Sequence, residues 1–430
     1  MNRKTRRKKK RIRLLSIGLI LIIGVLAATF VVNGIGKNDP NNNDNIANGD
    51  NEPEEVVNVP EPEKPKEPEV KPNITVNIKA TGDIMFHPSQ LDGAYDPNTK
   101  TYDFRNSFKA VRDILQSADL AIANFEGTTA GNTVYAYQGY PLFNAPDEVL
   151  DAIKDAGFDI LSTANNHSLD TRKAGVIRTV EQIKKRGMDS IGTYVEKPES
   201  RVLIKEIKGI KFAFLSYTEM VNGLESTMTQ SDLDAMVNII NETKMFEDIA
   251  YAKSQNADII IAYLHWGDEY ARVQAARQEI LAEKLITEGV DIILGSHPHV
   301  IQPAQKLEYK GETKFVAYSM GNFLSNQRVE TLVPYGMTEE VSKYTEDGVI
   351  VDINIEKNGE TGEVTLKDIT YIPLWVYKGT TEDGGTEHVV YPIMEYIESN
   401  ELNDKVKSRM QRSLSDTSKQ MELLESNTVE

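Results

Sequence analysis

Short, continuously apolar segments alternate with amphipathic segments through the middle of this 430-residue chain. The expected strands are 75–82, 119–124, 158–163, 258–264 and 291–295, and the expected helices are 105–117, 146–156, 172–187 and 271–288. Strands that are apolar on both faces indicate parallel strands covered by helices. The sequence therefore predicts an α/β or mixed α+β fold, in which sites form beyond the carboxyl ends of the strands.

The pattern changes in the last third of the chain. Residues 314–323 predict a further strand that ends in polar residues. Residues 347–378 alternate between apolar and polar and contain Asn358–Gly359, a turn signal that predicts a hairpin completing the sheets. A helical segment follows at about 391–412. We expect one folded domain over 74–378, followed by a helical extension and polar tail over 379–430.

Five of the six histidines lie in short motifs that directly follow expected strands. The motifs are ATGDIMFH, STANNHSLD, AYLHWGDEY and LGSHPHVIQ, and IANFEG stands in the same kind of position. Together they place Asp83, His87, Asn124, Glu126, Asn166, His167, Asp170, His265, Glu269, His297 and His299 at strand ends. Imidazoles, carboxylates and amides gathered in this way are the ingredients of a metal site with nitrogen and oxygen ligands.

Several of these residues also have ordinary structural interpretations. Asp83 could cap the turn after its strand, and Asn124 could close an Asx-turn. Asn166–His167 could form a hydrogen-bonded turn. Pro298 predicts extended backbone at His297, which suits a rigid loop with or without a metal.

The N-terminal segment has a strong charge asymmetry. Residues 3–13 hold nine Lys or Arg and no acidic residue, and residues 14–32 form a nearly uninterrupted apolar run of nineteen. This run predicts a transmembrane helix. The basic segment 1–13 would stay in the cytoplasm, so we expect a single-pass cell-membrane protein with an extracellular domain. A cleaved signal peptide is the alternative, because Ala27–Ala28 are small.

Composition excludes several kinds of chemistry and partner. With no cysteine, the chain forms no disulfide, offers no thiolate and carries no lipid anchor on a thiol. Beyond the nine N-terminal basic residues, 39 basic and 65 acidic residues remain, a net charge of about −26. This acidity disfavours nucleic acid as a partner, and a polyanionic substrate must be held locally. Residues 33–73, rich in Asn, Asp, Glu and Pro, predict a disordered tether.

The motifs, in their linear order over residues 75–330, resemble those of the CapA family, the poly-γ-glutamate capsule synthesis proteins of bacteria. This resemblance implies a metallophosphoesterase-like fold, a double β-sheet sandwich flanked by helices. It also implies two divalent metal ions, and ligands without thiolates suit Mn, Fe or Zn. The implied ligands are Asp83, His87, Glu126, Asn166, His265, His297 and His299. His167 would be the general acid or a hydrogen-bond donor to the transition state, and Asp170 its orienting partner.

The resemblance also implies a function and partners. The chain would be a membrane-anchored component of poly-γ-glutamate or related surface-polymer synthesis and export. Its expected partners are the cytoplasmic membrane, a capsule-synthesis membrane complex and an anionic surface polymer. An extracytoplasmic metal-dependent phosphoesterase or other hydrolase of unknown substrate is the alternative. A metal-free scaffold is a weaker hypothesis, because it does not explain the gathered ligand-type residues.

Overall fold

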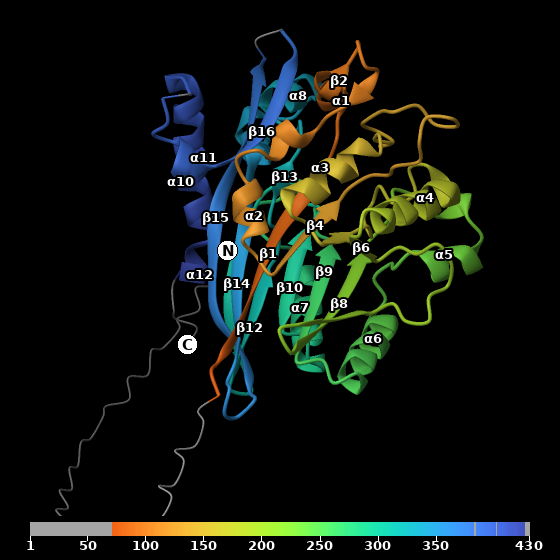
Figure 1. Ribbon diagram of the computed structural model, residues 1–430, viewed down its shortest axis with the longest axis vertical. Coiled ribbons are helices and arrows are strands. Elements are labelled where there is room, and N and C mark those ends of the chain that lie inside the picture. Colours follow the sequence, from red (N-terminus) through yellow and green to blue (C-terminus); the bar gives the residue numbers. More distant parts are fainter. Residues whose placement is uncertain (1–70, 382–383, 401, 426–430) are drawn as a thin grey trace, which may run out of the picture. The chain divides into compact units, whose positions relative to one another are not determined.

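The computed structural model describes residues 71–381, 384–400 and 402–425, which Figure 1 shows as coloured ribbon. The expected cytoplasmic segment 1–13, the transmembrane helix 14–32 and all but the last three residues of the tether 33–73 lie outside the described residues. Within the described part, no helix has the length and apolar character needed to cross a bilayer.

Two mixed β-sheets form the centre of the described fold. The first contains β1 (Ile74–Ile84), β4 (Leu120–Phe125), β5 (Ile160–Ser162), β6 (Asp189–Ile191), β13 (Asn322–Leu324), β14 (Asp347–Lys357), β15 (Val364–Thr380) and β16 (Thr386–Pro392). The second contains β7 (Leu203–Ile207), β8 (Ile210–Thr218), β9 (Ile259–His265), β10 (Ile292–Ser296), β11 (Ala304–Tyr309) and β12 (Glu312–Ala317). A separate small hairpin joins β2 (Tyr95–Asp96) and β3 (Thr101–Tyr102).

The strand order places the parallel strands of each sheet next to one another. The order is β16-β15-β14-β1-β4-β5-β6 in the first sheet, with β13 also beside β1, and β11-β12-β10-β9-β8-β7 in the second. Strands β1, β4, β5 and β6 are parallel, as are β8, β9, β10 and β12. The carboxyl ends of the parallel strands in each sheet therefore meet at one edge. The mixed α/β fold class expected from the sequence is confirmed.

The two sheets pack against each other through apolar inner faces. Ile78 of β1, Phe214 of β8 and Ile261 of β9 belong to the same buried cluster, together with Ile353 of β14. Each residue of this kind is essentially inaccessible to water, and burying one stabilises the fold by about 1.5–3 kcal/mol. This double layer is the sandwich that the sequence resemblance implied.

Helices cover the remaining faces, as Figure 1 shows. The 3₁₀ turn η1 (Arg105–Phe108), α1 (Pro88–Ala94), α2 (Arg112–Gln116) and α3 (Glu148–Ala156) pack on the outer face of the first sheet. Helices α6 (Glu242–Ser254) and α7 (Ala276–Glu288) pack on the outer face of the second. Two further helices, α4 (Arg172–Lys185) and α5 (Gln230–Met236), share a small apolar cluster. Helices α10 (Ile393–Tyr396), α11 (Asp404–Gln420) and α12 (Glu422–Glu425) lie beside β15. The remaining short helical segments are η2 (Glu225–Thr227), α8 (Val329–Leu332), η3 (Val333–Tyr335), α9 (Glu339–Ser342) and η4 (Lys343–Glu346).

Two expected elements differ from the sequence prediction. The helix expected over 105–117 is divided into η1 and α2. Phe108, Val111 and Leu115 are nevertheless buried in one cluster, so their spacing marked burial and not a continuous helix. The strand expected over 314–323 is also divided, because β12 and β13 belong to different sheets. The chain passes from one sheet to the other at Gly321, whose φ of +70° suits glycine.

The hairpin expected over 347–378 is confirmed, since β14 and β15 pair antiparallel and β14 joins β1. The segment 379–430, expected as a helical extension and tail, also supplies β16, which pairs with β15. Helix α11 begins later than the expected helical segment, after Asn403, whose side chain caps it by accepting from the Val406 N–H.

Helix α11 is fastened to the sheets by a buried carboxylate. The side chain of Glu346 is fully buried and accepts a hydrogen bond of 3.0 Å from Trp375 Nε1. Arg409 of α11 also donates to this carboxylate, and Arg328 and Arg412 each lie 3.8 Å from it. Removing one partner of a buried ion pair leaves the other partner's charge uncompensated, so this network couples α11 to the start of β14.

We predict that Glu346→Ala lowers the free energy of unfolding by about 3 kcal/mol, because it strands the buried Arg328 and removes the acceptor of Trp375. The matched control is Glu340→Ala. Glu340 pairs with Lys343 at the surface, 2.6 Å apart, so its removal should change stability by no more than about 0.5 kcal/mol. Chemical denaturation of both variants measures the difference, and equal losses would contradict the proposed anchoring.

Candidate metal centre

The candidate site lies where the parallel strands of both sheets end. Asp83 is the last residue but one of β1, and His265 is the last residue of β9. Glu126 directly follows β4, His297 directly follows β10, and Asn166 lies four residues beyond β5. The sequence predicted that these residues follow the carboxyl ends of strands, and the structure places those strand ends in two facing sheets. All five side chains are buried.

Asn124 holds the two carboxylates of the site. Its Nδ2 donates to Asp83 Oδ1 at 2.8 Å and lies 3.4 Å from Glu126 Oε2. Its Oδ1 accepts from Asn165 Nδ2 at 3.1 Å, which ties the loop after β5 to the end of β4. The sequence suggested only an Asx-turn for Asn124 and gave no signal for Asn165. In the structure, Asn124 orients the carboxylates of Asp83 and Glu126, and Asn165 orients Asn124.

His265 faces the same carboxylates. Its Nε2 lies 2.9 Å from Asn166 Oδ1 and 3.9 Å from Glu126 Oε1, and its Nδ1 lies 4.0 Å from Asp83 Oδ1. Ser296 Oγ, at 2.9 Å from Nδ1, fixes the ring. One candidate ligand atom from each of Asp83, Glu126 and His265 lies within 4.8 Å of the others, which is compatible with metal binding.

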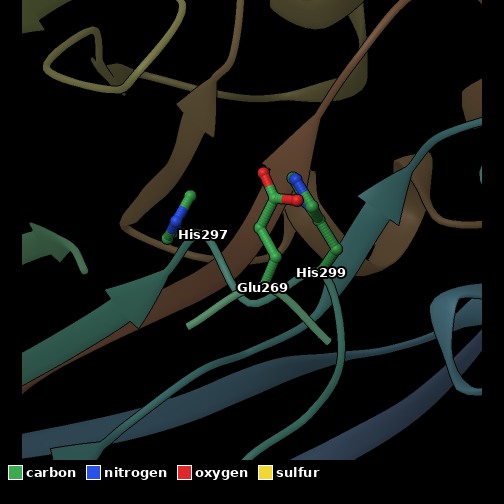
Figure 2. Close-up of side chains that lie close together, drawn as sticks. All are labelled: Glu269, His297 and His299. Atoms are coloured by element: carbon green, nitrogen blue, oxygen red, sulfur yellow. The ribbon is translucent and has the colours of Figure 1, made fainter. Parts of the chain in front are cut away.

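A second group of possible ligands adjoins the first. It consists of Glu269, His297 and His299, whose ligand atoms also lie within 4.8 Å of one another. Figure 2 shows the Glu269 carboxylate beside the His299 ring. His299 joins the two groups, because its Nδ1 is 3.2 Å from Asp83 Oδ2 and its Nε2 is 3.7 Å from Glu126 Oε1. Glu269 is exposed and had no assigned role in the sequence analysis, although its place four residues after His265 was visible.

The backbone at the two histidines corrects one expectation. Pro298 predicted extended backbone at His297, but the φ of His297 is +98° and that of His299 is +58°. Such backbone costs on the order of 1–3 kcal/mol per residue and is typical of functional sites. Here the positive φ values accompany a turn in which both rings reach the site, and the His297 N–H contacts Asp83 Oδ2 at 3.3 Å.

His167 and Asp170 form a hydrogen-bonded pair beside the carboxylates. Asp170 Oδ2 lies 2.7 Å from His167 Nδ1 and also accepts from the Phe143 backbone N–H. His167 Nε2 is 4.0 Å from Glu126 Oε1, so this nitrogen faces the candidate centre. The Phe143 ring packs edge-on against the imidazole, with centroids 4.7 Å apart. The pairing is compatible with the acid and orienting partner that the resemblance implied, and these roles stay predictions.

His87 lies at the side of the site and belongs to neither ligand group. Its Nε2 lies 3.2 Å from Ser325 Oγ, and its ring packs edge-on against Phe143 with centroids 5.1 Å apart. Its role as a ligand stays a prediction. Asn322, one of the polar residues that end the strand expected over 314–323, places Oδ1 3.2 Å from His299 Nδ1 and so supports a ligand group directly.

Electrostatics at the centre favour a cation. Burial raises the pKa of Glu126 well above its ordinary value, and the neighbouring Asp83 adds to this effect. Burial lowers the pKa of His265 far below its ordinary value and that of His297 to about 3, so both rings are neutral and offer a lone pair. Burial acts to lower the pKa of His299 too, but Glu126 and Asp83 outweigh it and raise this pKa to about 10. The carboxylates therefore favour a positive charge, which a proton on His299 or a metal ion can provide.

Two buried polar atoms indicate where a cation would fit. Glu126 Oε1 and His297 Nδ1 are buried and have no hydrogen-bond partner among the described residues. Buried polar atoms without a partner are rare in proteins and often mark the position of a bound ion or water. Nitrogen and oxygen donors without sulfur also suit Mn, Fe or Zn. The residues present thus fit the metal ions that the sequence resemblance implied.

Comparisons with known proteins agree with the sequence resemblance. The capsule biosynthesis protein CapA of Bacillus anthracis is 29% identical over 318 residues, which cover 72% of this chain and 69% of that protein. The PGA biosynthesis protein CapA of Bacillus subtilis is 29% identical over 273 residues, covering 61% of this chain and 64% of that protein. The chain thus spans about two thirds of the length of these relatives.

Among solved structures, the calcineurin-like phosphoesterase YfkN of Bacillus subtilis is 17% identical, with a TM-score of 0.38 over 80% of this chain and 98% of that one. The family described as bacterial capsule synthesis protein PGA_cap matches residues 77–327. Because this match covers more than half of the sequence, and carries the strand-end motifs of the candidate centre, the chain belongs to the PGA_cap family of bacterial capsule synthesis proteins.

Proposed function

We propose that this protein is a membrane-anchored, extracytoplasmic hydrolase of surface-polymer biosynthesis, acting on poly-γ-glutamate or a related polymer with two divalent metal ions. The observation that carries the proposal is the orphaned Glu126 Oε1, which lies between His265 and His299 and faces His167. A buried carboxylate surrounded by imidazoles supports a metal site, and the adjoining His167–Asp170 pair supports chemistry at that site.

The metal ions would be held by the two adjoining ligand groups. Asp83, Glu126 and His265 form one group, and Glu269, His297 and His299 form the other. Asn166 would add its amide oxygen beside His265. Divalent ions bound there would polarise the substrate and activate water for attack on a phosphoryl or acyl group.

The chain's own residues would position and move protons. In the protonated ring, His167 Nδ1–H would donate to Asp170, and the second proton, the one to be transferred, would be carried by Nε2, the nitrogen that faces Glu126. From there it would pass to the leaving oxygen or nitrogen as the substrate bond breaks. The Phe143 N–H fixes the Asp170 carboxylate, and the Phe143 ring limits rotation of the imidazole. Asn124 holds the two carboxylates in position by donating from Nδ2 to both.

The choice of a surface polymer rests on the family and the named relatives. A CapA-containing capsule pathway would place the domain outside the cell, attached through the apolar run 14–32. A metal-dependent phosphoesterase with another substrate is the second candidate. It is supported by the His167–Asp170 pair, since the same acid and metal arrangement serves phosphoester hydrolysis.

We predict that His265→Ala and His297→Ala lower the metal content of the purified protein. Removing a residue that only hydrogen-bonds to a metal ligand lowers metal affinity roughly tenfold or more. Removing a ligand itself should weaken metal binding at least as much. Elemental analysis after equilibrium dialysis against Mn, Fe or Zn gives the measurement. His388→Ala is the control, because His388 belongs to neither ligand group. Wild-type metal content in both ligand variants would exclude the proposed centre.

We predict that His167→Asn retains metal but reduces turnover of an activated phosphoester or γ-glutamyl substrate by about a hundredfold or more. Asp170→Asn should have an intermediate effect, because it removes the acceptor that orients the ring. Asn166→Ala should lower both metal content and turnover. Unchanged turnover, and unchanged surface polymer in a capsule-forming host, by a folded His167→Asn protein would leave binding or assembly as its function.

We predict a single membrane crossing with the N-terminus inside, because nine basic residues precede the apolar run 14–32. Protease added to intact protoplasts should remove the domain and spare an N-terminal fragment. Protection of the whole chain would contradict this topology. A mature protein beginning near residue 29 would show that the segment is a cleaved signal peptide.

A further inference from the structure

A polar cluster lies on β15 and β16, outside the residues of the metal centre, and Lys378 carries its positive charge, because burial lowers the pKa of His388 to about 3. Lys378 and His388 stand directly opposite each other in the antiparallel pairing of these strands, so their side chains share one face. Lys378 Nζ donates to Asn326 Oδ1 at 2.9 Å, and His388 Nε2 lies 2.9 Å from the same oxygen. One amide oxygen thus holds two nitrogen donors together.

Two groups of the cluster, the Lys378 ammonium and the Asn326 amide nitrogen, have no acidic partner in the described part of the chain. Lys378 is half-buried, and no carboxylate of the described residues forms a salt bridge with it. The amide oxygen of Asn326 accepts the bonds from Lys378 and His388. Its amide nitrogen has no acceptor among the described residues. His388 is 3% exposed, and its Nδ1 is buried without a partner. By contrast, the nearby Arg328 is paired with Glu330 and Glu346.

The cluster adjoins the acid side of the metal centre. Asn326 follows Ser325, whose Oγ lies 3.2 Å from His87 Nε2. The His87 ring packs on Phe143, and Phe143 packs on His167. Helix α1, which begins directly after His87, packs against β16, as Figure 1 also shows. The cluster is thus connected to His167 through Ser325, His87 and Phe143.

We propose that Lys378, Asn326 and His388 form a second subsite that binds an oxyanion of the substrate, a carboxylate or phosphate group separate from the bond at the metal centre. This inference rests on the proposed function and deepens it, because it assigns a substrate with repeated or multiple negative charges. An unpaired ammonium and a free amide NH₂ are suitable donors for such a group. They also provide the local attraction that a polyanion needs at a strongly acidic protein.

The test measures binding and not turnover. Full-length protein in detergent, loaded with metal, is titrated calorimetrically with γ-glutamate oligomers and, separately, with inorganic phosphate. Lys378→Gln should weaken binding of at least one probe about tenfold, a typical effect for a charge-assisted hydrogen bond. The matched control is Lys367→Gln on the same strand. Lys367 is exposed and paired with Glu356 at 3.2 Å, so this variant should bind as wild type does.

A second variant guards against an indirect effect of Lys378→Gln. Asn326→Asp keeps the shape and both hydrogen bonds of the residue but places a carboxylate between Lys378 and His388, and it should weaken binding at least as strongly. Metal content should equal that of wild type in both variants, which separates the subsite from the centre. Weaker binding of the oligomer assigns a polycarboxylate, and weaker binding of phosphate alone assigns a phosphorylated substrate.

Wild-type affinity for both probes in Lys378→Gln and Asn326→Asp would overturn the subsite. Loss of binding only together with loss of metal would overturn it as well. Neither result depends on catalysis. Unchanged turnover in His167→Asn would refute the proposed hydrolysis, but it would not affect these binding measurements.

Discussion

The apolar packing of one sheet on the other is the interaction on which the rest of the structure depends. Ile78 of β1 and Ile261 of β9 lie in one buried cluster, so the two sheets face each other along their parallel strands. Each strand then delivers its last residue or the following loop to the region between the sheets. Asp83, Glu126 and His265 meet there because their strands are held in place by this packing.

The same packing removes water from the groups that it brings together. Burial raises the pKa of Glu126 and lowers that of His265. The centre therefore combines a neutral His265 ring with carboxylates that favour a nearby cation. The strained backbone at His297 and His299 adds a further cost, which the surrounding strands and hydrogen bonds sustain. The net free energy of folding is small compared with the gain from apolar burial and the costs that oppose it. Burial in the apolar layer between the sheets offsets the cost of the polar centre.

The C-terminal part of the fold extends the region around the site. Glu346 joins α11 to the beginning of β14, and Asn322, at the start of β13, contacts both the Thr345 carbonyl and His299. Strands β15 and β16 carry Lys378 and His388 on a face next to α1. Residues far beyond the strand-end motifs thus shape the surroundings of the centre, and Lys378 adds a positive charge there.

The sequence by itself determined the kinds of element and the kinds of ligand. Uninterrupted apolar strands predicted buried parallel sheets. The polar residues that directly follow these strands predicted that Asp83, Glu126 and His265 would lie at carboxyl ends of strands. Only the tertiary structure decided which strand ends face each other, that β12 and β13 separate at Gly321, and that His297 adopts a positive φ. It also decided that Lys378 and His388 share Asn326, because cross-strand register and loop contacts between distant residues leave no local pattern. The propensity to form a helix or a strand depends on residues close in sequence, whereas these contacts depend on the packing of segments that are far apart in sequence.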